Sequence, residues 1–422
     1  MKVTDMTSIS LRSLALMGAM CVTTACGGGP GGSPNPADYQ PKAQPATQPA
    51  DPYAPPPKPK IKKQAKQIFT EAGALAAQGP SRYEDAIEMY ERVYKEEPLL
   101  KVSLYNIALL YEQMGDQSKA VEAYKFAADN GVAEGWVGIG LMQLASGNEG
   151  EAEASFRRAL DMEPLNGRAH LNLARIAKNR GDRRQAMESI RNALKEDSRN
   201  ADAYNLLAQI YLDMKRYKLA LLVCNAGLEE LDPEHSGLWT TQGVIFLNLK
   251  DVINATRSFR EAIKYDDKNY AARLNLGLIT FNYRDYERSY QLLSEAVNLR
   301  PNDPEIVISK AVVARALNRI DEAKQGYQKT LELKPNHPGA LFNLAIIQQD
   351  YTEVEGFDAR IQNVKEAISQ FENVLNFSQD ERLRKKVQRR IEEARLIIES
   401  IEIEKESAAT QQAQPAPADQ PQ

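Results

Sequence analysis

The sequence predicts an all-α protein, built as a solenoid of about nine helix pairs and closed by a C-terminal capping helix. One pattern of large and small residues returns about every 34 residues between residues 67 and 379. A period of this length is typical of repeated helix pairs, because a single pair cannot bury its own apolar face and must stack on its neighbours. The 422 residues, 43% hydrophobic and 26% charged, are sufficient for one long solenoid.

The unit that begins at Ala133 shows the pattern most clearly. Large residues stand at positions 4, 7 and 24, small residues at positions 8, 20 and 27, and proline at position 32. Small residues are expected where helix backbones approach closely, large residues fill the spaces between helices, and proline ends the second helix. In order of position, these residues are Trp136, Ile139, Gly140, Ala152, Phe156, Ala159 and Pro164.

This pattern resembles the tetratricopeptide repeat (TPR). The resemblance implies a right-handed superhelical solenoid whose concave groove is lined by the first helix of each pair. In the family, this groove commonly binds an extended peptide or a partner helix. The predicted units begin near Gln67, Lys101, Ala133, Gly167, Ala201, Ser236, Tyr270, Pro304 and Pro338.

The ninth unit departs from the period, because Ala367, Phe371 and Val374 come ten residues later than expected. The additional stretch, near Tyr351 to Arg360, is predicted to be a loop or a helix extension. It is either a harmless insertion or a lateral contact site.

Residues 380–406 carry apolar residues at intervals of three and four, which predicts an amphipathic helix that caps the open end of the solenoid. Its other face is either simply solvated or contacts an acidic partner or anionic lipid. That face holds Arg382, Arg384, Lys385, Lys386, Arg389 and Arg390.

Residues 1–25 are predicted to be a signal peptide, because Lys2 and Arg12 precede an apolar run too short to span a bilayer. The run leads into Thr-Thr-Ala-Cys at residues 23–26, which resembles the lipobox of bacterial lipoproteins, although Thr23 replaces the usual aliphatic residue. The resemblance implies that Cys26 becomes the first mature residue and carries acyl chains. An ordinary secretory signal, cleaved near Ala25, is the alternative.

Residues 26–66 and 407–422 are predicted to be disordered, because proline, alanine and polar residues dominate them. The first of these segments would link the lipidated Cys26 to the solenoid. The cysteines offer no disulfide framework, since Cys21 leaves with the signal peptide. Cys224 stands in an apolar stretch and is expected to be a small buried residue.

The sequence offers poor material for catalysis, for a metal site or for a cofactor. Its net charge of −4 is dispersed, which disfavours nucleic acid as a partner. His170 occupies a packing position, and His235 and His337 lie in turns between units, so a shared metal site is not expected. We therefore expect no enzyme, no catalytic residue, no metal and no cofactor.

Protein binding in the groove is the predicted function. Position 6 of the first helix is asparagine in several units, and its amide can both donate to and accept from a peptide backbone. The Lys-Asn-Asn-Lys-Arg clamp that some repeat proteins use on chaperone tails does not appear in register. The predicted groove residues are Asn106, Arg168, Asn172, Arg175, Lys178, Asn205, Gln209, Asn275 and Asn343.

These features predict a lipoprotein of the bacterial cell envelope that scaffolds the assembly of an envelope machine. Gly27 after the lipidated cysteine is compatible with the outer membrane, with the protein facing the periplasm. The expected partners are envelope proteins in the groove and a membrane through Cys26. The layout resembles TPR lipoproteins of gliding-motility machinery in myxobacteria. The alternatives are a pilotin-like factor for a secretin or pilus and a regulator of a cell-wall synthase.

Overall fold

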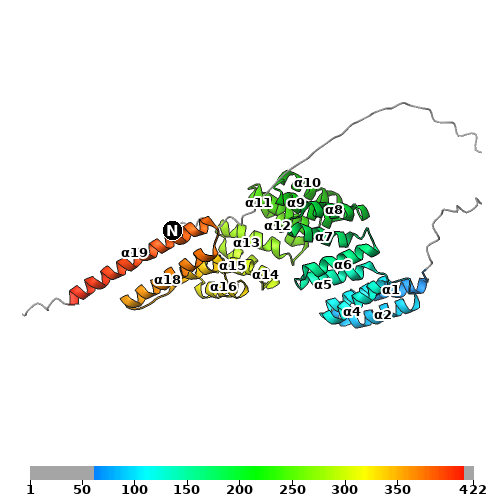
Figure 1. Ribbon diagram of the computed structural model, residues 1–422, viewed down its shortest axis with the longest axis horizontal. Coiled ribbons are helices and arrows are strands. Elements are labelled where there is room, and N and C mark those ends of the chain that lie inside the picture. The colour runs from blue at the N-terminus through cyan, green and yellow to red at the C-terminus, as the bar shows by residue number, and fades with distance from the viewer. Residues whose placement is uncertain (1–60, 413–422) are drawn as a thin grey trace, which may run out of the picture. The chain divides into compact units, whose positions relative to one another are not determined.

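The structure is a computed structural model that describes residues 61–412. This part of the chain is all helical, with nineteen α-helices and no strand (Figure 1). It divides within α9 (Ala201–Asp213) into two compact units, which are described separately. The predicted signal peptide, the acylated Cys26, most of the linker and the end of the tail lie outside the described residues and stay predictions.

The first compact unit comprises residues 61–206 and 213–215. Each helix packs mainly against its neighbours along the chain, as expected for stacked pairs. Its helices are α1 (Lys63–Ala76), the 3-10 turn η1 (Pro80–Arg82), α2 (Tyr83–Glu96), α3 (Val102–Gln113), α4 (Gln117–Asp129), α5 (Ala133–Ala145), α6 (Glu149–Met162), α7 (Gly167–Asn179) and α8 (Arg183–Glu196).

The second compact unit comprises residues 207–212 and 216–412 and repeats the same arrangement. Its helices are α10 (Tyr217–Ala226), the π-turn η2 (Gly227–Leu231), α11 (Ser236–Asn248), α12 (Val252–Tyr265), α13 (Tyr270–Asn282), α14 (Tyr286–Leu299), α15 (Pro304–Ala316), α16 (Ile320–Leu333), α17 (Pro338–Tyr351), α18 (Phe357–Phe377) and α19 (Glu381–Gln412).

Counted along the chain, α1 to α18 form nine consecutive pairs, and α19 follows them. The predicted all-α fold of repeated helix pairs is confirmed, and the starts predicted from Ala133 onward coincide with the first residues of α5, α7, α9, α11, α13, α15 and α17. The predicted linker boundary at residue 66 is too late, because α1 begins at Lys63. Ala65 is already buried, and the Lys62 amide donates to the Glu97 carboxylate at 3.1 Å, which anchors this end.

The residues at positions 8 and 24 of a pair pack directly against each other. A Cβ added to Gly140 would lie 2.6 Å from the ring of Phe156, and one added to Gly243 would lie 2.6 Å from the ring of Phe259. Both rings are fully buried. In these two pairs a side chain larger than that of glycine at position 8 would therefore collide with the phenylalanine at position 24. In the fifth pair, Cys224 takes position 24 and is also fully buried, as the sequence predicted.

The fifth pair also explains an irregular spacing in the sequence. Thirty-five residues separate its start at Ala201 from the next start at Ser236, and 34 residues separate Ser236 from Tyr270. The additional residue is accommodated where α10 passes into the π-turn Gly227–Leu231. A π-turn has one residue more per hydrogen-bonded ring, so it absorbs an insertion without changing the packed face.

The turn between the two helices of a pair needs one residue with positive φ. In pairs two to four this residue is Gly115, Gly147 or Gly181. In pairs five to eight it is instead Lys215, Lys250, Arg284 or Asn318.

The additional stretch in the ninth pair consists of a loop at residues 352–356 and a longer α18 of 21 residues. Asp358 and Arg360, in the added turns of α18, pair with Lys405 at 2.6 Å and with Glu404 at 3.0 Å on α19. Because α18 offers this longer surface, α19 continues to Gln412, past the boundary predicted at residue 406. Ile401, near the end of α19, is buried.

Candidate protein-binding face of the first helices

The first-helix face is the surface that positions 2, 5, 6, 9, 12 and 13 of the first helices form, and the predicted groove residues occupy it. In the first compact unit this face carries Asn106 on α3, Arg168, Asn172, Arg175 and Lys178 on α7, and Asn205 on α9. In the second unit it carries Gln209 on α9, Asn275 on α13 and Asn343 on α17.

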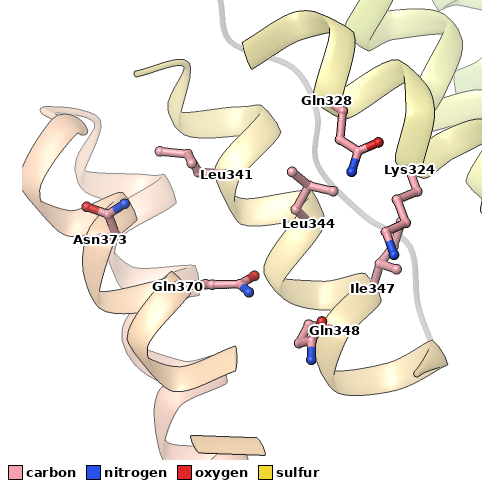
Figure 2. Close-up of a pocket in the computed structure, with 8 residues that line it drawn as sticks. All are labelled: Lys324, Gln328, Leu341, Leu344, Ile347, Gln348, Gln370 and Asn373. Atoms are coloured by element: carbon pink, nitrogen blue, oxygen red, sulfur yellow. The ribbon is translucent and has the colours of Figure 1, made fainter. Parts of the chain in front are cut away.

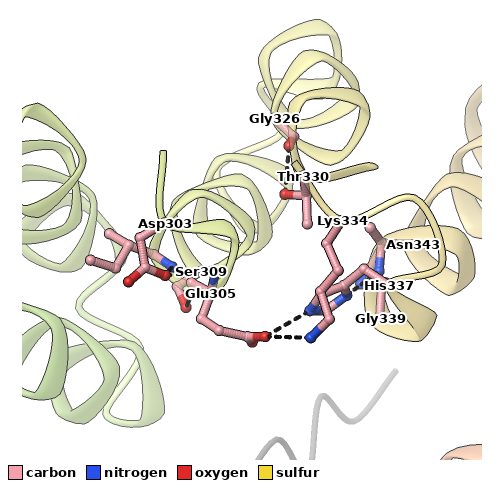
Figure 3. Close-up of polar contacts among 11 residues, drawn as sticks. Asp303, Glu305, Ser309, Gly326, Thr330, Lys334, His337, Gly339 and Asn343 are labelled. Carbon is pink, nitrogen blue, oxygen red and sulfur yellow. Dashed lines mark hydrogen bonds and ion pairs between the residues drawn. The ribbon is translucent and has the colours of Figure 1, made fainter. Parts of the chain in front are cut away.

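The asparagines at position 6 bond to their own helices. The side-chain amide of Asn172 donates to the backbone carbonyl of Arg168 at 2.9 Å, that of Asn275 to Ala271 at 2.8 Å, and that of Asn343 to Gly339 at 2.7 Å. Figure 3 shows the last of these bonds. One amide proton is thus used within the helix in each case, which leaves fewer groups of the amide for a ligand.

Asn172 also positions a neighbouring cation. Its side-chain oxygen accepts from Arg175 Nη1 at 3.3 Å, while the residue itself is only 6% exposed. Asn106 differs, because its side chain hydrogen-bonds to Tyr90 on the preceding pair. We therefore expect Asn172 to act on a ligand mainly through Arg175, and Asn106 to support the stacking of pairs.

Arg168 reaches from α7 to α3. Its Nη1 donates to the hydroxyl of Tyr105 at 2.7 Å, and its guanidinium lies 5.5 Å from the centre of that ring. Tyr105 in turn lies 5.7 Å from Tyr124, ring centre to ring centre. Glycines on α5 leave the space for Tyr124, since a Cβ at Gly138 would collide with its ring. The sequence analysis missed Tyr105, although it stands at position 5, a groove position.

Tyr124 is held as a hydrogen-bond donor. Its hydroxyl donates to Glu112 Oε2 at 2.6 Å. Burial, and next the hydrogen bond with the Glu112 carboxylate, raise the pKa of Tyr124 far above its ordinary value. The ring therefore stays neutral and supports the position of Tyr105.

The cationic side chains of α7 form ion pairs with acidic residues of α9. Arg175 lies 3.7 Å from Asp202, and Lys178 lies 3.6 Å from Asp213. Both pairs are partly exposed, so each contributes little to folding stability. Asp202 and Asp213 stand at positions 2 and 13, which are groove positions that the sequence analysis did not single out.

The predicted groove residues are thus only partly brought together. Arg168, Asn172 and Arg175 form one connected set with Tyr105 in the first unit. In the second unit, Gln209 lies 3.5 Å from the hydroxyl of Thr241, whereas Asn275 and Asn343 bond within their own helices.

The histidines and Cys224 have structural contacts. Nδ1 of His235 accepts from the Leu238 amide at 3.0 Å and so caps α11, while His170 is buried and contacts the Pro164 carbonyl at 3.0 Å. His337 caps α17 and shares the Glu305 carboxylate with Lys334 (Figure 3). Burial raises the pKa of the Cys224 thiol to about 12, so the thiol is protonated at neutral pH.

A pocket of about 240 Å³ lies between α16, α17 and α18 in the second unit (Figure 2). Its floor is apolar and its rim carries amides, and the sequence analysis did not predict it. Its lining residues are Lys324, Gln328, Leu341, Leu344, Ile347, Gln348, Gln370 and Asn373.

Residues 61–412 contain neither a candidate membrane span nor a candidate metal cluster. No helix in this range is long and apolar enough to cross a membrane. The same range holds no group of three or more His, Cys, Asp or Glu side chains arranged to hold a metal ion.

Comparison with known proteins finds a family match in part of the chain. The tetratricopeptide-repeat pattern matches residues 105–167, 138–182 and 171–236. Residues 105–236 therefore carry tetratricopeptide repeats. It is similar to the crystal structure of the APC/C hetero-tetramer Cut9-Hcn1, with a TM-score of 0.53 at 20% identity, over 65% of this chain and 54% of that one. This likeness concerns the fold alone.

Two relatives in sequence differ in their described activities. The type IV pilus assembly protein PilF of Pseudomonas aeruginosa is 26% identical over 212 residues, which is 49% of this chain and 82% of PilF. The human protein O-mannosyl-transferase TMTC3 is 24% identical over 276 residues, which is 56% of this chain and only 30% of that protein.

Proposed function

We propose that the protein is a membrane-tethered scaffold of the bacterial cell envelope that binds another envelope protein on the first-helix face of its first compact unit. The connected set of Arg168, Asn172, Arg175 and Tyr105 is the observation that carries this proposal. It combines exposed guanidinium groups with an aromatic ring, and Arg and Tyr are enriched among residues that dominate protein interfaces.

Only part of this set is available to a partner. Arg175 is held by Asn172 and by a weak, exposed pair with Asp202, which a partner carboxylate or carbonyl can replace at small cost. Arg168 is already bonded to Tyr105 and presents its remaining guanidinium protons. The ligand is therefore an extended or helical protein segment with acceptor groups, and the role is non-catalytic.

Photo-crosslinking in living cells tests the location of the interface. A photo-crosslinking amino acid at position 168 or 175 is expected to capture one partner, and the same amino acid at position 334, a turn of the second unit, serves as the matched control. In binding measurements with the captured partner, Arg175→Ala should weaken affinity about five- to one-hundredfold, and Asn172→Ala should do so by a smaller factor. Capture from position 334 alone would contradict the proposal.

The tether through Cys26 has its own test. Cys26→Ala removes the acceptor of the acyl chains, so the protein should stay unprocessed or leave the membrane fraction. A variant that is processed and fractionates like the parent would exclude acylation at Cys26, without bearing on the first-helix face.

The second candidate is a pilotin-like factor in pilus or secretin assembly. The similarity to PilF favours it, because the alignment covers most of PilF. Deletion of the gene should then abolish pili or secretin multimers. A motility defect with pili intact would favour gliding machinery instead, and a cell-shape defect would favour regulation of a cell-wall synthase.

A further inference from the structure

One edge of the second compact unit is unusually apolar and basic. It lies where the first helix of a pair turns into the second, in pairs five to seven, and we name it the turn edge. The side chains that define it are Lys218, Leu222, Lys250, Ile253, Tyr283 and Arg284.

We expect these side chains to follow one another along one edge, because the pairs stack in register. Lys250 and Arg284 occupy the same position of successive pairs, and the residue before each is also exposed and apolar. The hydroxyl of Tyr217, at the start of α10, lies 3.4 Å from Asn248 at the end of α11, which joins the edge between pairs five and six.

The apolar side chains of the turn edge stand far out of the protein. Ile253 is 84% exposed, Tyr283 is 70% exposed and Leu222 is 65% exposed. Ile253 stands at the start of α12, Tyr283 in the turn before α14 and Leu222 in the middle of α10. Each has a basic residue near it in the sequence: Lys250, Arg284 and Lys218, respectively. Isolated apolar tips among cations are suited to enter the interfacial zone of a bilayer.

The acidic residues of the edge form no ion pair with these cations in residues 61–412. Asp251 accepts from the backbone amide of Asn254 at 3.1 Å, and Asp285 accepts from that of Arg288 at 3.3 Å, so both carboxylates cap helices and keep their negative charge beside Lys250 and Arg284. Glu287 pairs with Arg319 at 3.2 Å. Lys250 and Arg284 form no ion pair within residues 61–412, while the whole chain carries a net charge of −4.

The backbone gives an independent reason to look for a function here. Lys250 and Arg284 have φ of 63° and 65°, a left-handed conformation in which an L side chain is strained, and the equivalent turns of pairs two to four use glycine. The turn therefore does not need these long basic side chains in order to form.

We propose that the turn edge is a docking surface for an anionic phospholipid bilayer, with Ile253, Tyr283 and Leu222 entering the interface and the cations meeting lipid phosphates. The occupant is a bilayer because its anionic surface complements the charge of the edge, and because the tips project singly and do not form one flat patch. The inference does not depend on acylation of Cys26. It would orient the second compact unit on the membrane surface.

Vesicle flotation tests the proposal with the full chain carrying Cys26→Ala, so that no acyl chain contributes. The protein should float with vesicles of phosphatidylcholine mixed with phosphatidylglycerol, should not float with pure phosphatidylcholine, and should be released by salt. The segment before Cys26 is common to every variant, so differences among variants report on the turn edge.

Two double variants separate charge from apolar contact. Lys250→Asn with Arg284→Asn keeps the turn, because asparagine adopts this conformation at Asn318 (φ 59°). It should lower vesicle partitioning about fivefold for each charge removed. Ile253→Ser with Tyr283→Ser should lower vesicle partitioning at least tenfold, because both apolar side chains are lost from the interface. A tenfold change in partitioning corresponds to about 1.4 kcal/mol of transfer free energy.

The matched control is Lys385→Asn with Arg389→Asn, which removes two exposed cations from α19 in the same compact unit. This control should partition like the parent. Loss of binding in the control with normal binding in the turn variants would move the membrane contact to α19 and overturn the proposal. Equal binding to neutral vesicles, or no binding to either, would overturn it as well, and an unchanged melting temperature in each variant shows that folding is intact.

Discussion

The turns of pairs two to four and those of pairs six to eight have the same backbone shape but different residues. Gly115, Gly147 and Gly181 have φ of 80° to 81°, and Lys250, Arg284 and Asn318 have φ of 59° to 65°. The helix pairs on either side pack alike. The comparison teaches that this position requires a backbone conformation and not a particular side chain, so folding leaves the choice of side chain open.

The two groups of pairs share the contact that builds the core. Gly140 under Phe156 and Gly243 under Phe259 are equivalent contacts in the first and second compact units.

Truncating the buried ring should have the largest effect, and the same effect in both units. Phe156→Ala and Phe259→Ala should each lower the free energy of unfolding by about 3 to 5 kcal/mol, because the cavity lies at a fully buried site. Trp239→Ala should cost less, since this side chain is only half-buried and its indole donates to the Pro233 carbonyl at 2.8 Å.

Hydrogen exchange checks this prediction. Protection should fall in the altered pair and its neighbours and persist in distant pairs, because each pair contacts mainly its neighbours. Uniform loss of protection across residues 61–412 would contradict the one-dimensional architecture.

A methyl group at position 8 should have the next largest effect. Gly140→Ala and Gly243→Ala would each place Cβ 2.6 Å from a phenylalanine ring that has no room to move away. We expect about 1 to 3 kcal/mol of destabilisation in urea unfolding. Gly150→Ala, where a Cβ meets nothing within 4 Å, is the control and should be neutral or stabilising.

Alkaline pH should distinguish the fifth pair, whose position 24 is Cys224. Burial raises the pKa of this thiol from 9.0 to about 12, so the unfolded chain loses the proton first. The contribution of the thiol to the free energy of unfolding is therefore complete below pH 9. It is lost as the pH rises from 9 towards 12, by about 1.4 kcal/mol for each pH unit. The slope of stability against pH should be smaller in Cys224→Ala over this range, and identical slopes would show that the thiol is not buried.

Exchanging the turn residues should have the smallest effect and opposite signs in the two groups. Gly147→Lys should destabilise the protein by about 1 kcal/mol, because lysine is strained at positive φ. Lys250→Gly should stabilise it by about 0.5 to 1 kcal/mol and weaken vesicle binding at the same time. If both substitutions shifted the melting temperature in the same direction, the two groups of turns would not be equivalent.

The sequence predicted the starts of most helix pairs but not the form of the ninth pair. The packing positions predicted the helix starts from Ala133 onward, because each pair repeats the same contacts with its neighbours. The additional stretch of the ninth pair was located but not assigned to loop or helix, since its helical part depends on partners far along the chain, such as Lys405 and Glu404.

The candidate site was predicted less completely than the fold. The register placed Arg168, Asn172 and Arg175 on the first-helix face, where the structure connects them. Tyr105 was missed because its partner Arg168 stands 63 residues away, and no spacing within one helix reveals that contact.

The sequence by itself determined that the chain folds into stacked helix pairs, because small and large residues at fixed positions allow only one way of packing a pair. It also determined which residues stand at the groove positions of each first helix. Only the tertiary structure decided which of them are used internally: Asn172, Asn275 and Asn343 bond to their own helices, and Arg168 bonds to Tyr105. The physical reason is that a hydrogen bond depends on the distance between two atoms after packing, which the period of a repeat does not specify.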